Sequence, residues 1–225
     1  PIYSLQASYQ QRLWHGLTNM ATYTWSHSTD NASDGQDFVP NGAQPNDSTN
    51  TRADKGNSNF DVRQRFVWSL SYEFPKWTAA KWFGEGWEVS SVVTLMSGHP
   101  FHINYNFVDD FDGSGEFFPR PDVVAPVRYN RSNPAQFLDL SSFAIPCTFP
   151  QPPSPAGSVT ARVCTFTGGV NSMHFGNLGR NALLGPDYRN WDFSIIKDTK
   201  ITERWRFNFR VDFFNLFNHP NLANP

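Results

Sequence analysis

Long hydrophobic runs are missing from this 225-residue sequence. No stretch approaches the roughly 20 apolar residues that a membrane-spanning helix needs, so a helical membrane protein is excluded. An excess of charge of one sign is missing too, because 18 basic and 20 acidic residues leave a formal net charge of -2. Nucleic acid binding would ask for a concentrated basic face, and we therefore expect no nucleic acid partner.

Cysteine is scarce, since the chain has two, Cys147 and Cys164. Both lie in one region rich in Pro, Ser, Gly and Thr. We expect them to form a disulfide, which would place this region in an oxidising compartment outside the cytoplasm. Two free buried thiols are the alternative.

Aromatic residues are abundant, at 16% of the chain, and they follow a period of two. Residues 205 to 214 show the pattern most simply. One side of this segment carries Trp205, Phe207, Phe209, Val211 and Phe213, and the other carries Arg206, Asn208, Arg210 and Asp212. Because strand side chains alternate between faces, the segment predicts a strand with one apolar face and one charged face.

Six segments share this alternation and predict long strands. They cover about residues 2–14, 19–28, 60–74, 86–105, 190–198 and 205–214. Within the fourth segment, Gly98 and Pro100 would interrupt a central strand. We expect one long strand with a kink or bulge there, and two strands joined by a turn are the alternative.

The connections between these strands alternate between short and long. The long ones are residues 29–59 and 106–188. In an antiparallel meander, every second connection lies at the same end, so both long loops should lie on one side of the sheet. This asymmetry is typical of an up-and-down barrel of the outer-membrane kind.

A soluble β-sandwich would also give each strand one apolar face. Three features favour a membrane barrel instead: strands of up to fifteen residues, aromatic residues near strand ends, and charges of both signs on the polar faces. Six strands are too few to close a barrel, since the smallest outer-membrane barrels use about eight. The predicted fold is therefore all-β, an antiparallel arc of a large transmembrane β-barrel.

The order of motifs resembles the C-terminal part of the barrel of TonB-dependent outer-membrane transporters, in particular the Oar-like group. The motifs are "YTWSHS", "DVRQRFVWSLSYEFP", "GWEVSSVVTLMSGHPF" and "FGNLGRNALLGPDYRNWDFSIIKDTKITERWRFNFRVDFFNLFNHPN". The resemblance implies a barrel of about 22 strands with a plug, in the outer membrane of a Gram-negative-type bacterium. It also implies TonB-driven uptake of a scarce or bulky extracellular ligand, such as a siderophore, glycan or peptide.

The sequence begins at Pro1 without an initiator Met and ends at Pro225, just past an aromatic strand. We therefore expect a piece of a longer protein. The resemblance implies that this piece lacks the plug and the last barrel strand. On it, the partners would be outer-membrane lipid, the missing plug, the other barrel strands and the TonB system. A secreted soluble β-sandwich that binds or acts on glycans is the alternative.

The alternation assigns strand residues to the two sides of the barrel wall. The side chains expected to face a wet lumen are Arg63, Arg65, Arg206, Arg210 and Asp212. Those expected to face lipid are Phe66, Trp68, Phe207 and Phe209. Ligand-binding residues are not predicted, because ligand choice depends on long loops that the pattern does not decode.

Motifs for catalysis and metal binding are weak. His99 and His102 have metal-site spacing without a third ligand nearby. Asp110 and Asp112 resemble the start of a calcium loop, but Pro121 stands at its last ligand position, so an EF-hand is rejected. A looser calcium site is left open. We expect no enzyme activity, no metal and no cofactor.

Overall fold

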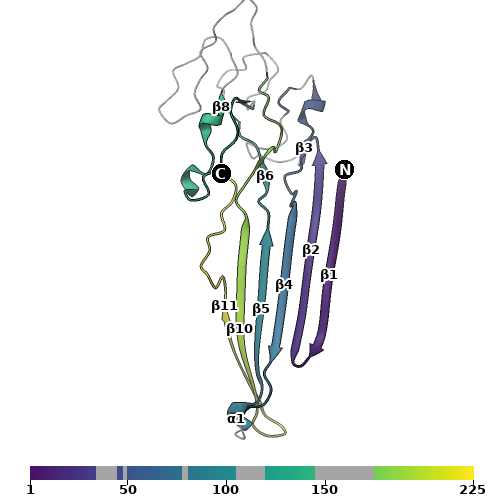
Figure 1. Ribbon diagram of the computed structural model, residues 1–225, viewed down its shortest axis with the longest axis vertical. Helices are drawn as coiled ribbons and strands as arrows, with labels where there is room; N and C mark the ends of the chain where they lie inside the picture. The colour runs from purple at the N-terminus through teal and green to yellow at the C-terminus, as the bar shows by residue number, and fades with distance from the viewer. Residues whose placement is uncertain (34–44, 48–49, 78–80, 105–119, 145–174) are drawn as a thin grey trace, which may run out of the picture.

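The computed structural model describes residues 1–33, 45–47, 50–77, 81–104, 120–144 and 175–225. One antiparallel sheet dominates it, with the strand order β1-β2-β4-β5-β10-β11 (Figure 1). Its strands are β1 (Ile2–Trp14), β2 (Leu17–Asp30), β4 (Gln64–Glu73), β5 (Trp87–Met96), β10 (Tyr188–Lys200) and β11 (Arg206–Phe213). Each long strand pairs with the next one along the chain, so the predicted all-β meander is confirmed. β1 and β11 lie at the two edges, and the sheet is not closed.

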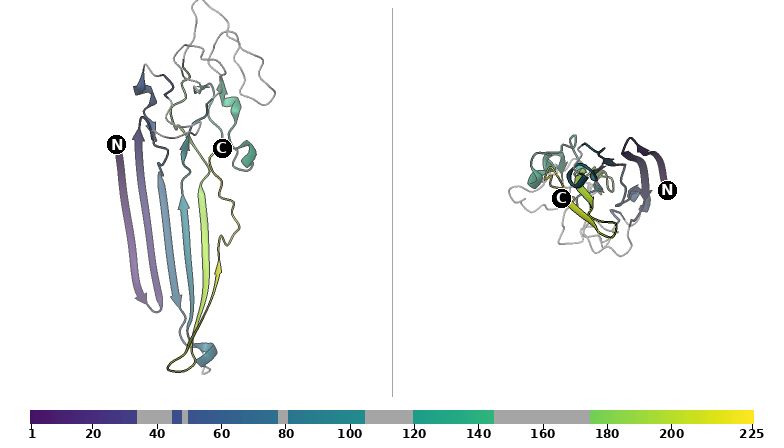
Figure 2. Two further views of the ribbon diagram at one scale, coloured as in Figure 1. Left: turned by 180° about the vertical axis from the view of Figure 1, so that it is seen from behind. Right: turned by 90° about the horizontal axis from the view of Figure 1, so that it is seen from below.

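The ends of the sheet differ in what they carry (Figures 1 and 2). The described parts of both long connections gather at one end, together with both chain termini. These parts hold β3 (Gly56–Asn57), β6 (Pro100–Phe101), β7 (Asp122–Val123), β8 (Phe143–Ala144), β9 (Leu183–Leu184) and the short 3-10 helices Thr51–Asp54, Pro134–Gln136 and Leu140–Ser142. The opposite end carries the turn of helix α1 (Lys81–Gly84) and tight connections. We call these the loop end and the turn end.

The turn between β1 and β2 uses two residues with positive φ, His15 at 52° and Gly16 at 84°. Such a turn matches the right-handed twist of the strands it joins. A Cβ on Gly16 would lie 2.3 Å from the Glu73 carbonyl oxygen. Glycine is therefore required here, because the turn packs directly on the end of β4.

The strand predicted over residues 86–105 is wrong in its second half. β5 ends at Met96, and the chain then leaves the sheet instead of bulging and continuing. Residues 100–101 pair with β9, and Gly185 N donates to the His99 carbonyl oxygen at 2.9 Å. A Cβ on Gly98 would lie 1.9 Å from the Gly185 carbonyl oxygen, so the glycine allows two backbones to cross in close contact.

The strand predicted over residues 60–74 begins later, at Gln64. The reason is local competition for hydrogen bonds. Ser28 N donates to the Asp61 carboxylate at 2.8 Å. In a continued strand, the same N–H would donate to a backbone carbonyl oxygen instead, so the side chain of Asp61 replaces the strand pairing. The segments predicted over 190–198 and 205–214 correspond to β10 and β11, and β10 is longer at both ends.

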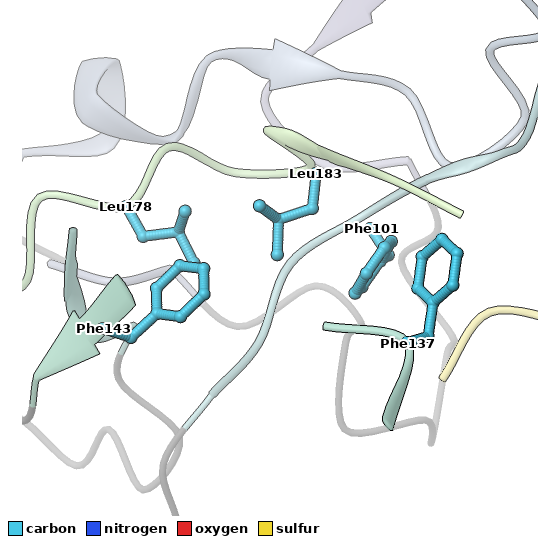
Figure 3. Packing of buried hydrophobic residues seen from close by; sticks show 5 residues of the cluster. All are labelled: Phe101, Phe137, Phe143, Leu178 and Leu183. Carbon is cyan, nitrogen blue, oxygen red and sulfur yellow. The ribbon is translucent and has the colours of Figure 1, made fainter. Parts of the chain in front are cut away.

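Among the side chains that the structure describes, fully buried hydrophobic ones are found at the loop end and not in the long strands. The cluster consists of Phe101, Phe137, Phe143, Leu178 and Leu183, which converge from different segments of the second long connection (Figure 3). The apolar side chains of the long strands remain half-buried or exposed. A sandwich would bury them beneath a second sheet, and the other described sheets have two strands each.

Candidate functional site at the loop end of the sheet

A buried ion pair joins the two long connections. Arg120 Nη2 donates to Asp54 Oδ1 at 2.6 Å, and the two side chains are only 3% and 4% exposed. Arg120 Nε also donates to the Leu178 carbonyl oxygen at 2.9 Å. Asn46 completes the junction, since its side chain accepts from Arg120 N at 2.7 Å and donates to the Gly176 carbonyl oxygen at 3.1 Å. Segments far apart in the sequence are thereby fixed to one another.

A second arginine fixes the same connections to the end of β2. Arg180 Nη1 donates to Asp30 Oδ1 at 2.5 Å and to the Asp30 carbonyl oxygen at 3.0 Å. Its Nη2 donates to Ser33 Oγ at 2.6 Å. A Cβ on Gly56 would lie 2.1 Å from the Arg180 carbonyl oxygen, so β3 and this segment touch backbone to backbone.

Two asparagines exchange hydrogen bonds beside these ion pairs. Asn181 Nδ2 donates to the Asn57 carbonyl oxygen at 2.7 Å, and Asn57 Nδ2 donates to the Asn181 carbonyl oxygen at 2.8 Å. Asn181 adopts a φ of 50°, a conformation that asparagine tolerates better than most residues. Its Oδ1 lies 2.8 Å from His102 Nδ1, and His102 is 4% exposed. Burial lowers the pKa of His102 from 6.5 to about 4, and the nearby Arg120 and Arg180 charges act in the same direction.

The loop end should lose stability in mild acid because of His102. Its pKa is lower in the folded state than in the unfolded state, so the unfolded state binds a proton first as the pH falls below 6.5. The expected loss is about 3 kcal/mol by pH 4. The loss of stability is measured by urea unfolding of the loop end at a series of pH values from 7 to 4, with limited proteolysis as the probe of unfolding. A His102→Gln variant, which does not titrate, should show a shallower pH dependence, and equal slopes would contradict this role.

The predicted lumen-facing residue Arg63 lies just before β4, outside the regular alternation. Its Nη2 lies 3.3 Å from Asp61 Oδ2 and 2.9 Å from His27 Nδ1. Asp61 is 4% exposed and holds the end of β2 through Ser28 N. Arg63 therefore joins the loop-end network, whereas the other four residues lie in regular strands.

The strand register places the remaining predicted residues on two opposite faces. One face, the polar face, carries Arg65, Arg206, Arg210 and Asp212. The opposite, apolar face carries Phe66, Trp68, Phe207 and Phe209, and Lys197 lies on this same face. On the polar face, Asp212 accepts from Arg210 Nε at 2.7 Å and from Ser194 Oγ at 2.5 Å. That these faces border a lumen and lipid, respectively, stays a prediction.

Several predicted features fall outside the described residues, namely Cys147, Cys164, Asp110 and Asp112. The disulfide and the looser calcium site stay predictions. Of the two histidines with metal-site spacing, His99 and His102, the side chain of His102 is hydrogen-bonded to Asn181. In the described part of the chain, no group of three or more His, Cys, Asp or Glu side chains could hold a metal ion.

A hollow of about 850 Å³ opens beside the hydrophobic cluster. Residues 128–141 form most of its wall, and Ile103 and Pro225 contribute. Tyr129 and Phe137 lie in its lining with their ring centroids 5.4 Å apart. The polar groups Arg128, Asn130, Gln136, Asp139 and Ser141 also line it. Aromatic rings beside a few polar groups are the usual lining of small-molecule sites.

The comparison with family models decides what kind of protein this is. No described helix has the length and apolar character to cross a membrane. The model of the outer membrane beta barrel domain matches residues 3–225. The chain belongs to this family. Neither the curated proteins nor the solved structures gave a match.

As an outer-membrane β-barrel domain, the chain resides in the outer membrane, as the sequence predicted. In such a barrel the apolar face of the wall lies against lipid, and a long sheet whose apolar side chains are left uncovered by the described residues fits this membership. In barrels of this kind the long loops are extracellular and the short turns periplasmic. The extracellular position of the loop end therefore stays a prediction for this chain.

Proposed function

We propose that this domain is part of a TonB-dependent transporter that captures a scarce or bulky ligand outside the cell. The observation that carries the proposal is the mutual locking of the two long connections at the loop end. Arg120 with Asp54 and Arg180 with Asp30 fix loops that emerge between different pairs of strands. A fixed extracellular platform of this kind is preorganised, so a ligand need not supply the free energy of ordering it.

The hollow beside Tyr129 and Phe137 supports ligand capture. Its volume of about 850 Å³ lies within the range of about 300 to 1,000 Å³ usual for small-molecule sites. Arg128 lines it, and among the described residues its guanidinium has no hydrogen-bond or ion-pair partner. A siderophore, glycan or peptide with an acceptor group would satisfy those donors.

Transport by this domain requires further parts, namely a plug, additional barrel strands and the TonB system. The strand motifs and their order resemble TonB-dependent transporters, which supports these partners. A barrel wide enough for a bulky ligand needs a plug to prevent leakage, and a plugged barrel needs work to open it. We propose no catalytic step and no cofactor for this domain.

Uptake should therefore depend on a functional TonB system. Cells that express the full-length protein are compared with and without TonB, and depletion of medium components is followed by mass spectrometry. We expect at least one component to be depleted only when both the protein and TonB are present. Cells that lack the protein but retain TonB provide the control. Equal depletion with and without TonB would exclude TonB-driven transport. The domain would then be interpreted as part of a passive channel or an adhesin.

A further inference from the structure

The apolar face of β10 carries a single lysine among aromatic neighbours near the turn end. Lys197 pairs with Trp87 of β5 on one side and with Phe209 of β11 on the other. All three side chains share one face, because directly paired residues in a sheet project the same way. The next row pairs Thr199 with Phe207. An ammonium group thus lies within an aromatic surface that spans three strands.

The ammonium is held at this position by its surroundings. Lys197 is 8% exposed, and its Nζ donates to the Glu85 carbonyl oxygen and lies 5.6 Å from the centre of the Trp87 ring. The side chain therefore bends toward the turn end. Among the described residues, no carboxylate lies within 4 Å of Nζ, while the nearby Glu85 carboxylate pairs with Lys76 at 2.5 Å. In the part of the chain that the structure describes, the positive charge of Lys197 is therefore met by the carbonyl oxygens of Glu85 and Asp198 and by no carboxylate.

A groove of about 350 Å³ lies directly over this lysine. Its walls come from β5, β10, β11, the turn after β10 and α1, and are almost entirely apolar. Trp87 and Phe83 contact each other edge to face at 6.2 Å, and Trp77 stacks near Trp87 at 6.4 Å. Such aromatic belts lie at the level of lipid head groups in outer-membrane barrels.

A second cation on the same face of β10 marks the opposite boundary of the apolar band. Arg189 precedes Lys197 by eight residues with an unbroken register, and Trp191, Phe193 and Ile195 lie between them. Eight strand residues span about 26 Å along the strand, or about 20 Å along the bilayer normal at a strand tilt of about 40°. Long basic side chains that extend outward add a few ångströms at each end, which brings the spacing close to the apolar band of about 25 Å in outer-membrane barrels. Lys197 therefore lies at the level where hydrocarbon gives way to head groups on the turn side.

We propose that this groove binds one anionic phospholipid, with its phosphate at Lys197 and an acyl chain along Phe207 and Phe209. The occupant follows from complementarity. The walls match hydrocarbon, and the ammonium, which no described carboxylate meets, matches a lipid of net negative charge. The nearby Lys76 and Glu85 cancel each other, so they add no further preference. The site depends on the outer-membrane location of the domain and not on the proposed transport.

The test measures lipid retained by the full-length protein in native mass spectrometry. The protein is released from nanodiscs that contain phosphatidylglycerol or phosphatidylcholine. Wild-type protein should retain one phosphatidylglycerol and discriminate against phosphatidylcholine. Lys197→Met should retain about fivefold less phosphatidylglycerol, since one basic residue near an anionic lipid surface has about that effect. Lys197→Arg should restore retention.

Two controls separate binding from folding. Lys200→Met removes a charge three residues away on the opposite face and should leave retention unchanged. Thr199→Trp fills the groove and leaves Lys197 in place, so it should reduce retention without loss of the Glu85 contact. Equal retention by wild-type protein, Lys197→Met and Thr199→Trp would overturn the proposal. Retention of phosphatidylcholine as strong as that of phosphatidylglycerol would do the same.

Discussion

Replacing Phe193 with arginine should destabilise the inserted protein by about 2 to 4 kcal/mol, the range found for arginine at the middle of the lipid face of a barrel. Phe193 lies midway between Arg189 and Lys197 on β10 and pairs with Ser91 and Phe213. An arginine at that depth cannot extend its guanidinium to either head-group layer without deforming the bilayer. Urea titration of the protein folded into lipid vesicles measures the change.

Two further substitutions make this expectation specific to face and depth. Val92 pairs with Ser69 and Asp192 on the opposite, polar face, so Val92→Arg should change stability by no more than about 0.5 kcal/mol. Phe209 lies beside Lys197 at the boundary, and Phe209→Arg should cost only about 0 to 1 kcal/mol. Equal losses for Phe193→Arg and Val92→Arg would show that the faces are assigned wrongly.

Removing the Asp54 carboxylate should open the loop end. The Asp54→Ala variant leaves the buried Arg120 guanidinium without its counter-charge, and breaking such a pair costs about 3 to 5 kcal/mol. The loss should be local, because both residues lie outside the long strands. The backbone amide of Arg120 donates to Asn46 and should be protected from hydrogen exchange in the wild-type protein. In Asp54→Ala, its exchange rate should rise about a hundredfold or more.

An exposed ion pair at the same end provides the matched control. Asp187 pairs with Arg131 at 2.8 Å and Arg189 at 3.3 Å, and all three side chains are solvent-accessible. Asp187→Ala should therefore cost at most about 1 kcal/mol. The double variant Asp54→Leu with Arg120→Leu should regain most of the lost protection, because no buried charge is left unpaired. If Asp54→Ala and Asp187→Ala behave alike, the buried pair is not what holds the loops.

The sheet could be predicted from the sequence because alternation over ten or more residues is a local signal. Its boundaries depended on contacts from elsewhere. Met96 ends β5 because the Gly98 backbone crosses Gly185, a residue from a distant segment. Likewise, nothing around Asp61 indicates that its carboxylate will accept from Ser28 N. Each strand was therefore recognised, while several strand ends were misplaced, most of all the start of β4 and the end of β5.

The loop-end network could not be predicted in the same way. Arg120 and Asp54 are 66 positions apart, and charged residues in polar loops are ordinarily solvated. The signals present were Gly56 and the asparagines around it, which tolerate close or left-handed backbone. Their partners become evident only once the strand order brings the two connections together. Lys197 is similar, since alternation places it on the apolar face but does not reveal Trp87 beside it.

The spacing of Arg189 and Lys197 has a consequence for the membrane itself. Barrel strands are tilted by about 40°, so their separation of about 26 Å along β10 amounts to about 20 Å along the bilayer normal. Long basic side chains add a few ångströms by extending outward. This thickness is less than that of an average bilayer and agrees with the thinner bacterial outer membrane. In a thicker bilayer, hydrophobic mismatch would force the surrounding lipid to compress around this part of the wall.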